Sequence, residues 1–185
     1  MKVLAISGSL RSDSHNTKLL RAAADLFPRD VEVEIWVGLK DIPPYDEDDD
    51  GADAPAAVAR LRAAIAGADA VFFATPEYNH SIPGVLKNAI DWVSRPAGAS
   101  VFLNKPTAVV GASTGAFGAV WAQAELRKVL GSPGARVVDG ELALGHAHER
   151  FDEDGRLRDA NLREELQDVV DLLVAQVHAR EAIAA

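Results

Sequence analysis

Short apolar segments alternate along the chain with longer segments in which apolar residues recur every three or four positions. An apolar run of about four to eight residues is typical of a strand, whereas the longer spacing is typical of a helix with one buried face. The pattern predicts strands at residues 2–7, 31–36, 68–75, 105–112 and 135–138. It predicts helices at residues 16–27, 55–67, 83–94, 119–130 and 161–180.

The regular alternation of strands and helices favours parallel pairing with right-handed crossovers. Segment 31–36 (VEVEIW) alternates apolar and acidic residues, so we expect it at or near a sheet edge, whereas the continuous apolar run at 68–75 (ADAVFFAT) predicts a central strand. Five such strands match an α/β fold with an open, doubly wound, flavodoxin-like sheet of order 2-1-3-4-5 and helices on both faces. We find no internal repeat and expect a single domain over residues 1–185.

The composition excludes several classes of chemistry. The chain has no cysteine, which excludes disulfides, thiolate nucleophiles and cysteine-ligated iron–sulfur clusters, so redox chemistry would need a bound cofactor. Its net charge of −9 argues against nucleic acid as a partner, because binding a phosphate backbone relies on a basic surface. The sequence shows neither an apolar run of about 18 residues nor a signal-peptide pattern. We therefore expect a cytoplasmic protein that does not enter a membrane.

In a doubly wound sheet, the loops that leave the first, third and fourth strands meet at the carboxyl edge. The first loop, residues 8–17 (GSLRSDSHNT), offers hydroxyl groups, an amide and the guanidinium of Arg11 directly before a helix. Together with the N–H groups of the helix start, these groups can bind a phosphate, although Ser, Asp and Asn are also ordinary helix caps. The loop has neither the GxGxxG nor the GxxxxGK[ST] spacing, so it indicates neither a Rossmann dinucleotide site nor a P-loop.

The other two loops contain features that suit a flat ligand. Residues 75–84 (TPEYNHSIPG) include two stiffening prolines and Tyr78, whose ring can lie beside another ring. Residues 112–118 (ASTGAFG) include two glycines, which would let the backbone approach a ligand closely. Each loop alone could be a plain turn. Their expected meeting at one edge favours a binding site.

These motifs resemble the NADPH-dependent FMN reductase family, which includes flavin, quinone, azo and chromate reductases. Residues 8–16 (GSLRSDSHN) are similar to the family's GSxRxxSxN motif, and residues 76–92 (PEYNHSIPGVLKNAIDW) follow its PEYNxSxPGxLKNAxDW signature. Residues 105–119 (KPTAVVGASTGAFGA) and 151–157 (FDEDGRL) also follow the family pattern. The resemblance therefore covers nearly the whole chain.

The resemblance implies that FMN is bound by residues of all three loops. The residues implied to bind its phosphate are Ser9, Arg11, Ser14, Asn16 and Thr17. Those implied to face its isoalloxazine ring are Pro76, Glu77, Tyr78, Asn79, Ser113 and Gly115. Because FMN itself would carry the electrons, we expect no catalytic side chain.

The resemblance also implies the partners. NADPH would donate electrons, and a small molecule such as a flavin, a quinone, an azo compound or chromate would accept them. Because one flavin face would serve both substrates in turn, we expect ping-pong kinetics. A homodimer or homotetramer is implied, with the helix at 83–94 contributing to the contact. Two other functions stay open on the sequence: a flavodoxin-type electron carrier that does not oxidise nicotinamide, and a phosphate-ligand sensor without catalysis.

Several further residues have ordinary structural interpretations. The acidic segment 46–53 (DEDDDGAD) lacks the spaced ligands of an EF-hand loop, and His146 and His148 have no evident third ligand for zinc, so we expect no metal site. Trp92 is most simply a packing residue. An alternative for Trp92 is that it reaches the flavin site of a neighbouring subunit. Arg95, just beyond the helix at 83–94, could reach a neighbouring subunit's flavin or the NADPH phosphate.

Overall fold

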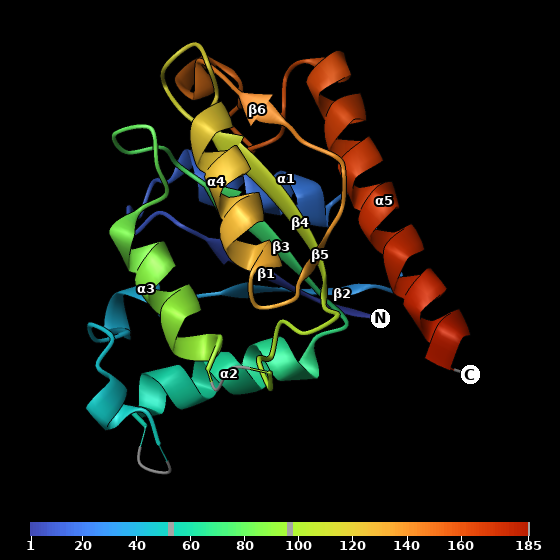
Figure 1. Cartoon of the computed structure of the whole chain (residues 1–185). Helices are drawn as coiled ribbons and strands as arrows, with labels where there is room; N and C mark the ends of the chain where they lie inside the picture. The colour runs from blue at the N-terminus through green and yellow to red at the C-terminus, as the bar shows by residue number, and fades with distance from the viewer. Residues whose placement is uncertain (52–53, 96–97, 185) are drawn as a thin grey trace.

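A parallel sheet forms the centre of the computed structural model, which describes residues 1–51, 54–95 and 98–184 (Figure 1). Its strands lie in the order β2-β1-β3-β4-β5, and every pair along this path is parallel. These strands are β1 (Lys2–Ser7), β2 (Glu32–Trp36), β3 (Ala70–Thr75), β4 (Pro106–Ala112) and β5 (Arg136–Val137). The predicted fold class and strand order are confirmed, with β2 at the edge and the fully buried β3 at the centre.

Two short strands, rather than one, follow β4 in the sheet. β5 pairs with the start of β4, and β6 (Ala143–Leu144), which the sequence analysis did not predict, pairs with its end. Between them the chain leaves the ladder at Asp139, Gly140 and Glu141, which are poor strand formers. Arg127 on the neighbouring helix replaces the missing strand hydrogen bonds. Its guanidinium donates to the carbonyl oxygens of Val138, at 2.6 Å, and Gly140.

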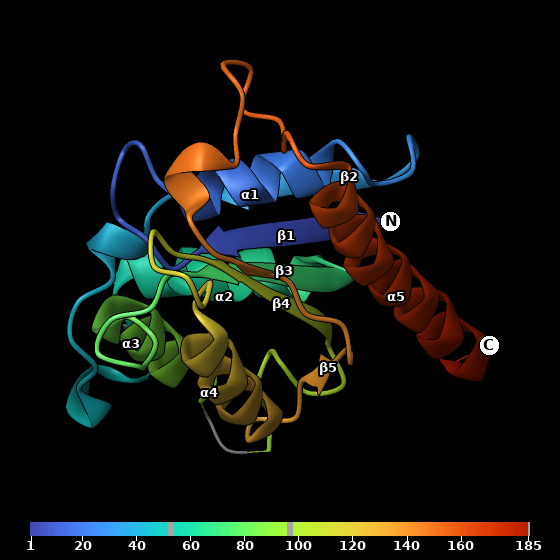
Figure 2. The ribbon, with the colours of Figure 1, turned by 90° about the horizontal axis from the view of Figure 1, so that it is seen from above.

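Helices cover both faces of the sheet, as predicted (Figure 2). They are α1 (His15–Ala24), α2 (Ala56–Gly67), α3 (Gly84–Val93), α4 (Val120–Gly131) and α5 (Ala160–Ala184). Short 3-10 turns lie at η1 (Leu39–Asp41), η2 (Glu47–Asp49) and η3 (Ala147–Glu149). The predicted helices exist with shifted ends, since α1 stops at Ala24, before a turn that leads to Pro28, and α5 continues to Ala184.

The period-two alternation of the strands divides the core between the two faces. Val3 and Ala5 of β1 pack with α1 and α5, whereas Leu4 and Ile6 pack with α2 and α3. Burial on both faces explains why β1 and β3 consist of continuous apolar runs. Within the described residues, no helix combines the length and the apolar character that crossing a membrane requires.

Trp92 belongs to the core of its own chain. Its side chain is fully buried, its Nε1 donates to the carbonyl oxygen of Pro43 at 2.8 Å, and its ring meets Tyr45 edge-on with centroids 5.0 Å apart. The packing interpretation of Trp92 is therefore confirmed. The alternative, in which Trp92 reaches a neighbouring subunit, is wrong because the ring has no exposed surface.

Candidate functional site

A polar cavity of about 130 Å³ lies at the carboxyl edge of the sheet, where the loops after β1, β3 and β4 meet. The residues of the predicted site that line it are Ser9, Arg11, Ser14, Asn16, Pro76, Glu77, Tyr78 and Ser113. His15, Ala112 and Thr114 also line it and were not among the predicted site residues. The structure thus brings together residues from all three predicted loops.

A larger, mainly apolar hollow of about 440 Å³ adjoins this polar cavity. Arg11 and Tyr78 line both spaces, and the hollow is otherwise formed by apolar residues and glycines, among them Leu10 and Val85. A small space with polar donors beside a larger apolar one suits a ligand with a charged group at one end and a flat ring at the other.

The start of α1 borders the polar cavity. Ser14 is the N-cap of α1, and its Oγ accepts the N–H of Thr17 at 3.2 Å, which leaves the hydroxyl hydrogen free to donate. The first N–H groups of a helix have no partner within the helix and form a partially positive end that favours anions. Arg11 is exposed and forms no ion pair with a described residue. Thr17 follows in the first turn but does not line the cavity.

Asn16 connects the first loop to the third. Its Nδ2 donates to the carbonyl oxygen of Ala112 at 2.9 Å, and its Oδ1 accepts the N–H of Ala112 at the same distance. The side chain is buried, so these bonds are shielded from water. Its predicted contact with phosphate stays a prediction, for which the backbone N–H and the second amide hydrogen are available.

The carboxylate of Glu77 is turned toward α4. Its Oε2 accepts the N–H groups of Trp121 and Ala122, each at 3.1 Å, at the helix start. Its Oε1 lies 3.6 Å from Nδ1 of His80. Glu77 therefore borders the cavity while its charged group serves a helix end, which differs from the expectation that this residue faces a ring.

Tyr78 begins a tight two-residue turn. Its N–H and carbonyl pair with the carbonyl and N–H of Ser81, at 3.0 and 3.1 Å, and the central residues Asn79 and His80 have φ of 53° and 59°. Two consecutive positive φ angles are typical of a type I′ turn. Asn79 lies exposed at the tip and does not line the cavity, whereas Tyr78 is half exposed beside it.

The third loop packs tightly against β6. Gly118 has a φ of 57°, and a Cβ atom at this position would lie 2.2 Å from the carbonyl carbon of Ala143. Gly115 donates its N–H to the Oγ of Ser113 at 3.1 Å, and its carbonyl accepts the N–H of His146. The glycines were expected to admit a ligand, but Gly118 instead admits the backbone of β6.

His15 lines the cavity but was not among the predicted site residues. Its ring lies parallel to that of Phe151, with centroids 6.3 Å apart, and its buried Nδ1 has no partner among the described residues. Burial lowers the pKa of His15, the charges of Lys18 and Arg11 lower it further, and Asp13 partly opposes them. Its position directly after the cap residue Ser14 was the available signal, since the first helical residue borders whatever the helix start binds.

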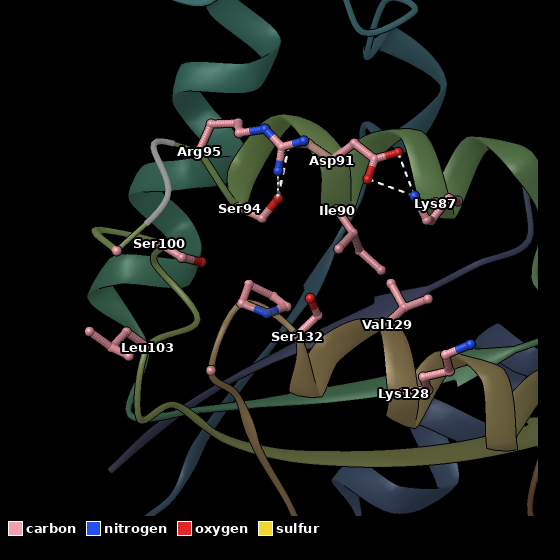
Figure 3. A pocket seen from close by; sticks show the side chains of 13 residues that line it. Lys87, Ile90, Asp91, Ser94, Arg95, Ser100, Leu103, Lys128, Val129 and Ser132 are labelled. Atoms are coloured by element: carbon pink, nitrogen blue, oxygen red, sulfur yellow. Dashed lines mark hydrogen bonds and ion pairs between the residues drawn. The ribbon is translucent and has the colours of Figure 1, made fainter.

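Another cavity, of about 630 Å³, lies between the ends of α3 and α4 (Figure 3). Arg95 lines it, with its guanidinium 5.5 Å from the ring centre of Tyr45, and so does Leu103, which lies just before β4. This cavity is thus at the amino edge of the sheet. Arg95 therefore lies away from the three loops of its own chain, and contact with another subunit's site stays a hypothesis.

The structure shows no metal-binding cluster in the described part of the chain: no three His, Asp or Glu side chains are grouped to hold an ion. The rings of His146 and His148 lie 6.5 Å apart. In the acidic segment, Asp50 pairs with Arg62 at 2.7 Å, and residues 52 and 53 lie outside the described residues.

Comparison with known proteins identifies related enzymes. Residues 1–149 match the family described as NADPH-dependent FMN reductase. The chain is 45% identical to an NAD(P)H-dependent FMN reductase of Pseudomonas aeruginosa, covering 94% of this chain and 93% of the relative. It is 39% identical to a 2-hydroxy-1,4-benzoquinone reductase of a Burkholderia species, covering 97% and 98%.

Solved structures show the same similarity. The flavoenzyme FerB of Paracoccus denitrificans, an NAD(P)H:acceptor oxidoreductase, superimposes with a TM-score of 0.87 at 39% identity, covering 96% of this chain and 97% of FerB. A flavodoxin of Pseudomonas aeruginosa has a TM-score of 0.59 at 17% identity, covering 96% and 99%. The flavodoxin comparison confirms the predicted fold and carries no information on activity.

The environment of His15 predicts a pH dependence of stability. Because the folded-state pKa lies below the ordinary value of 6.5, the unfolded chain binds the proton more readily, so stability is lost as the pH falls through 6.5 toward the lowered pKa. His15→Phe keeps an aromatic ring against Phe151 and removes the titration. Urea titrations of both proteins without flavin measure the effect. Between about pH 7 and pH 5, the free energy of unfolding should fall less for His15→Phe than for the parent. His178→Phe, at an exposed site on α5, is the matched control; equal losses in parent and His15→Phe would contradict the assignment.

Proposed function

Given that this chain belongs to the NADPH-dependent FMN reductase family, we propose that FMN binds across the two adjoining cavities at the carboxyl edge of its sheet. Family membership makes the chain an NAD(P)H-dependent flavin oxidoreductase. The observation that carries the proposed placement is the juxtaposition of the polar cavity at the start of α1 with the apolar hollow, joined through Arg11 and Tyr78.

The polar cavity fits the phosphate of FMN. A phosphate there would meet the N–H groups at the start of α1, the hydroxyls of Ser9 and Ser14, and the guanidinium of Arg11. Asn16 and Thr17 belong to the same helix start and complete the proposed phosphate set. His15 also faces this space and offers a ring nitrogen.

The apolar hollow and the two other loops fit the isoalloxazine ring. Tyr78 supplies a flat surface between the cavities, and Pro76 and Ser113 line the wall beside it. Glu77, Asn79 and Gly115 complete the proposed ring-facing set: Asn79 lies in the turn that Tyr78 begins, and Gly115 donates its N–H to the Oγ of Ser113.

This arrangement separates the role of FMN in the reaction from the role of the protein's residues. When bound, FMN supplies the redox chemistry, taking up hydride from a reduced nicotinamide and passing electrons to an acceptor. The protein's residues bind the phosphate, orient the ring and leave the apolar hollow accessible to a second flat molecule. No side chain is required to take or give a proton in this proposal.

The proposal extends to the electron donor and the electron acceptor. Relatives named as FMN and quinone reductases favour a flavin or a quinone as the acceptor and NADPH as the donor. A cytoplasmic location belongs to the same proposal, because reduced nicotinamide is produced and regenerated there. Membership of the family favours an enzyme that oxidises NADPH over an electron carrier that does not oxidise nicotinamide.

We further propose a homodimer or homotetramer. Tyr78, Val85, Phe117 and Trp121 are large apolar or aromatic side chains that stay at least one-third exposed on the loops and helix starts around the site. Contiguous exposed apolar surface is typical of a region that contacts another molecule. Trp92 does not contribute to this surface.

Replacing Arg11 tests the phosphate position. A charge-assisted contact with phosphate corresponds to about a 10- to 150-fold change in affinity, so Arg11→Ala should weaken FMN binding by that factor at fixed ionic strength. Riboflavin lacks the phosphate, so its binding should barely change. Fluorescence titrations of both flavins measure the difference, and Arg21→Ala on the exposed side of α1 controls for the loss of positive charge. Equal weakening of both flavins, or of neither, would overturn the phosphate assignment.

Steady-state kinetics test the shared use of one flavin face. Because donor and acceptor would occupy the same hollow in turn, the rates should follow a ping-pong pattern. Double-reciprocal plots of rate against NADPH concentration at several fixed quinone concentrations should be parallel. Intersecting lines across several acceptors would show that both substrates bind together and would exclude the single shared face.

Light scattering tests the oligomeric state. We expect a dimer or tetramer at micromolar concentration, because association would cover the exposed aromatic side chains around the site. Phe117→Ser removes the most exposed of them, at 66% exposure, and should shift the distribution toward smaller species. A monomeric parent with full NADPH-oxidising activity would contradict the proposal.

A further inference from the structure

Helix α4 begins beside the candidate site without a side-chain cap from its own sequence. Its N-cap is Ala119, which has a left-handed φ of 64° and a side chain that cannot accept a hydrogen bond. The N–H of Val120 donates to the carbonyl oxygen of Phe117 at 3.2 Å. The next two N–H groups, of Trp121 and Ala122, therefore need an acceptor from elsewhere in the chain.

Glu77 supplies that acceptor from the loop after β3. Its Oε2 binds both N–H groups at 3.1 Å, and its side chain is only 13% exposed. A carboxylate in this position satisfies two donors at once and complements the positive end of the helix. The contact joins two loops of the site across 44 residues of sequence.

The residue that caps α4 directly precedes Tyr78, which borders both cavities. The turn from Tyr78 to Ser81 is fixed internally by its own backbone hydrogen bonds, but these bonds do not position it relative to the rest of the chain. Glu77, which directly precedes the turn, is bound to the start of α4. His80 adds a second contact, since its ring meets that of Trp121 edge-on with centroids 4.7 Å apart.

We propose that Glu77 is a positioning residue for flavin binding. By holding the start of α4, its carboxylate sets the separation between Tyr78 and the loop from Ser113 to Gly118, which leads into α4. The inference rests on the proposed function, since it requires the flavin ring to lie against these two loops. Glu77 acts through Tyr78 and makes no contact with the reacting atoms.

Substitution of Glu77 should change the two flavin affinities differently from substitution of Arg11. Glu77→Ala should weaken FMN and riboflavin by a similar factor of about 5 to 30, as expected for the loss of a helix cap that also holds the ring-binding loop. Both flavins carry the ring, so both should be affected. The fluorescence of the bound flavin should rise, because Tyr78 would lie less closely on the ring.

Glu77→Asp separates position from charge. Aspartate keeps a carboxylate for the start of α4 but is shorter by one methylene group. To bind the same N–H groups, its backbone would have to move toward α4, and the adjacent Tyr78 would move with it. This variant should remain near parental thermal stability and still bind both flavins more weakly. If Glu77→Ala does not fold, Glu77→Asp alone tests whether Glu77 positions Tyr78 for flavin binding.

Asp159→Ala is the matched control for helix capping. Asp159 accepts the N–H of Asn161 at 2.9 Å at the start of α5, so its loss removes one exposed capping bond. This variant should lower thermal stability without changing either flavin affinity. If the Glu77 variants lower only stability and bind both flavins like the parent, Glu77 is merely a structural cap and the inference is overturned. A parent that binds neither flavin would instead overturn the proposed function itself.

Discussion

The candidate site depends on the pair of hydrogen bonds between the side chain of Asn16 and the backbone of Ala112. These bonds join residues that are 96 positions apart and are buried from water. Leaving a buried amide or peptide group unpaired costs about 1–3 kcal/mol, so the start of α1 is held against the end of β4. The helix N–H groups and Ser14 therefore border the same cavity as Ser113.

The other loops are held by contacts of the same kind between distant segments. Glu77 binds the start of α4, and Gly118 allows the backbone of Ala143 to approach closely enough for β6 to pair with β4. Several polar residues of the family motifs thus hold loops in place. In the proposed site, Arg11, Ser9 and the N–H groups at the start of α1 would meet the phosphate, and Tyr78 would meet the ring.

This arrangement suits a protein whose cofactor carries the chemistry. An oxidoreductase of this kind needs a rigid edge that orients a flavin, together with space for a second flat molecule. The rigidity comes from the sheet, whose central strands are buried on both faces by two sets of helices. Where the ladder is interrupted after β5, the guanidinium of Arg127 satisfies the carbonyl groups that leave it.

The sequence by itself determined the order of elements and the loops that form the site, because period-two and helical spacings and the Pro and Gly boundaries are local properties. Through the family resemblance it also assigned Arg11, Tyr78 and Ser113 to one site, and the three residues line one cavity. Only the tertiary structure decided the direction of each polar side chain: Glu77 turns to α4, and Asn16 turns to Ala112. It also decided that Trp92 is buried and that β6 completes the sheet. Their partners lie far away in the sequence, so these contacts follow from packing rather than from local pattern.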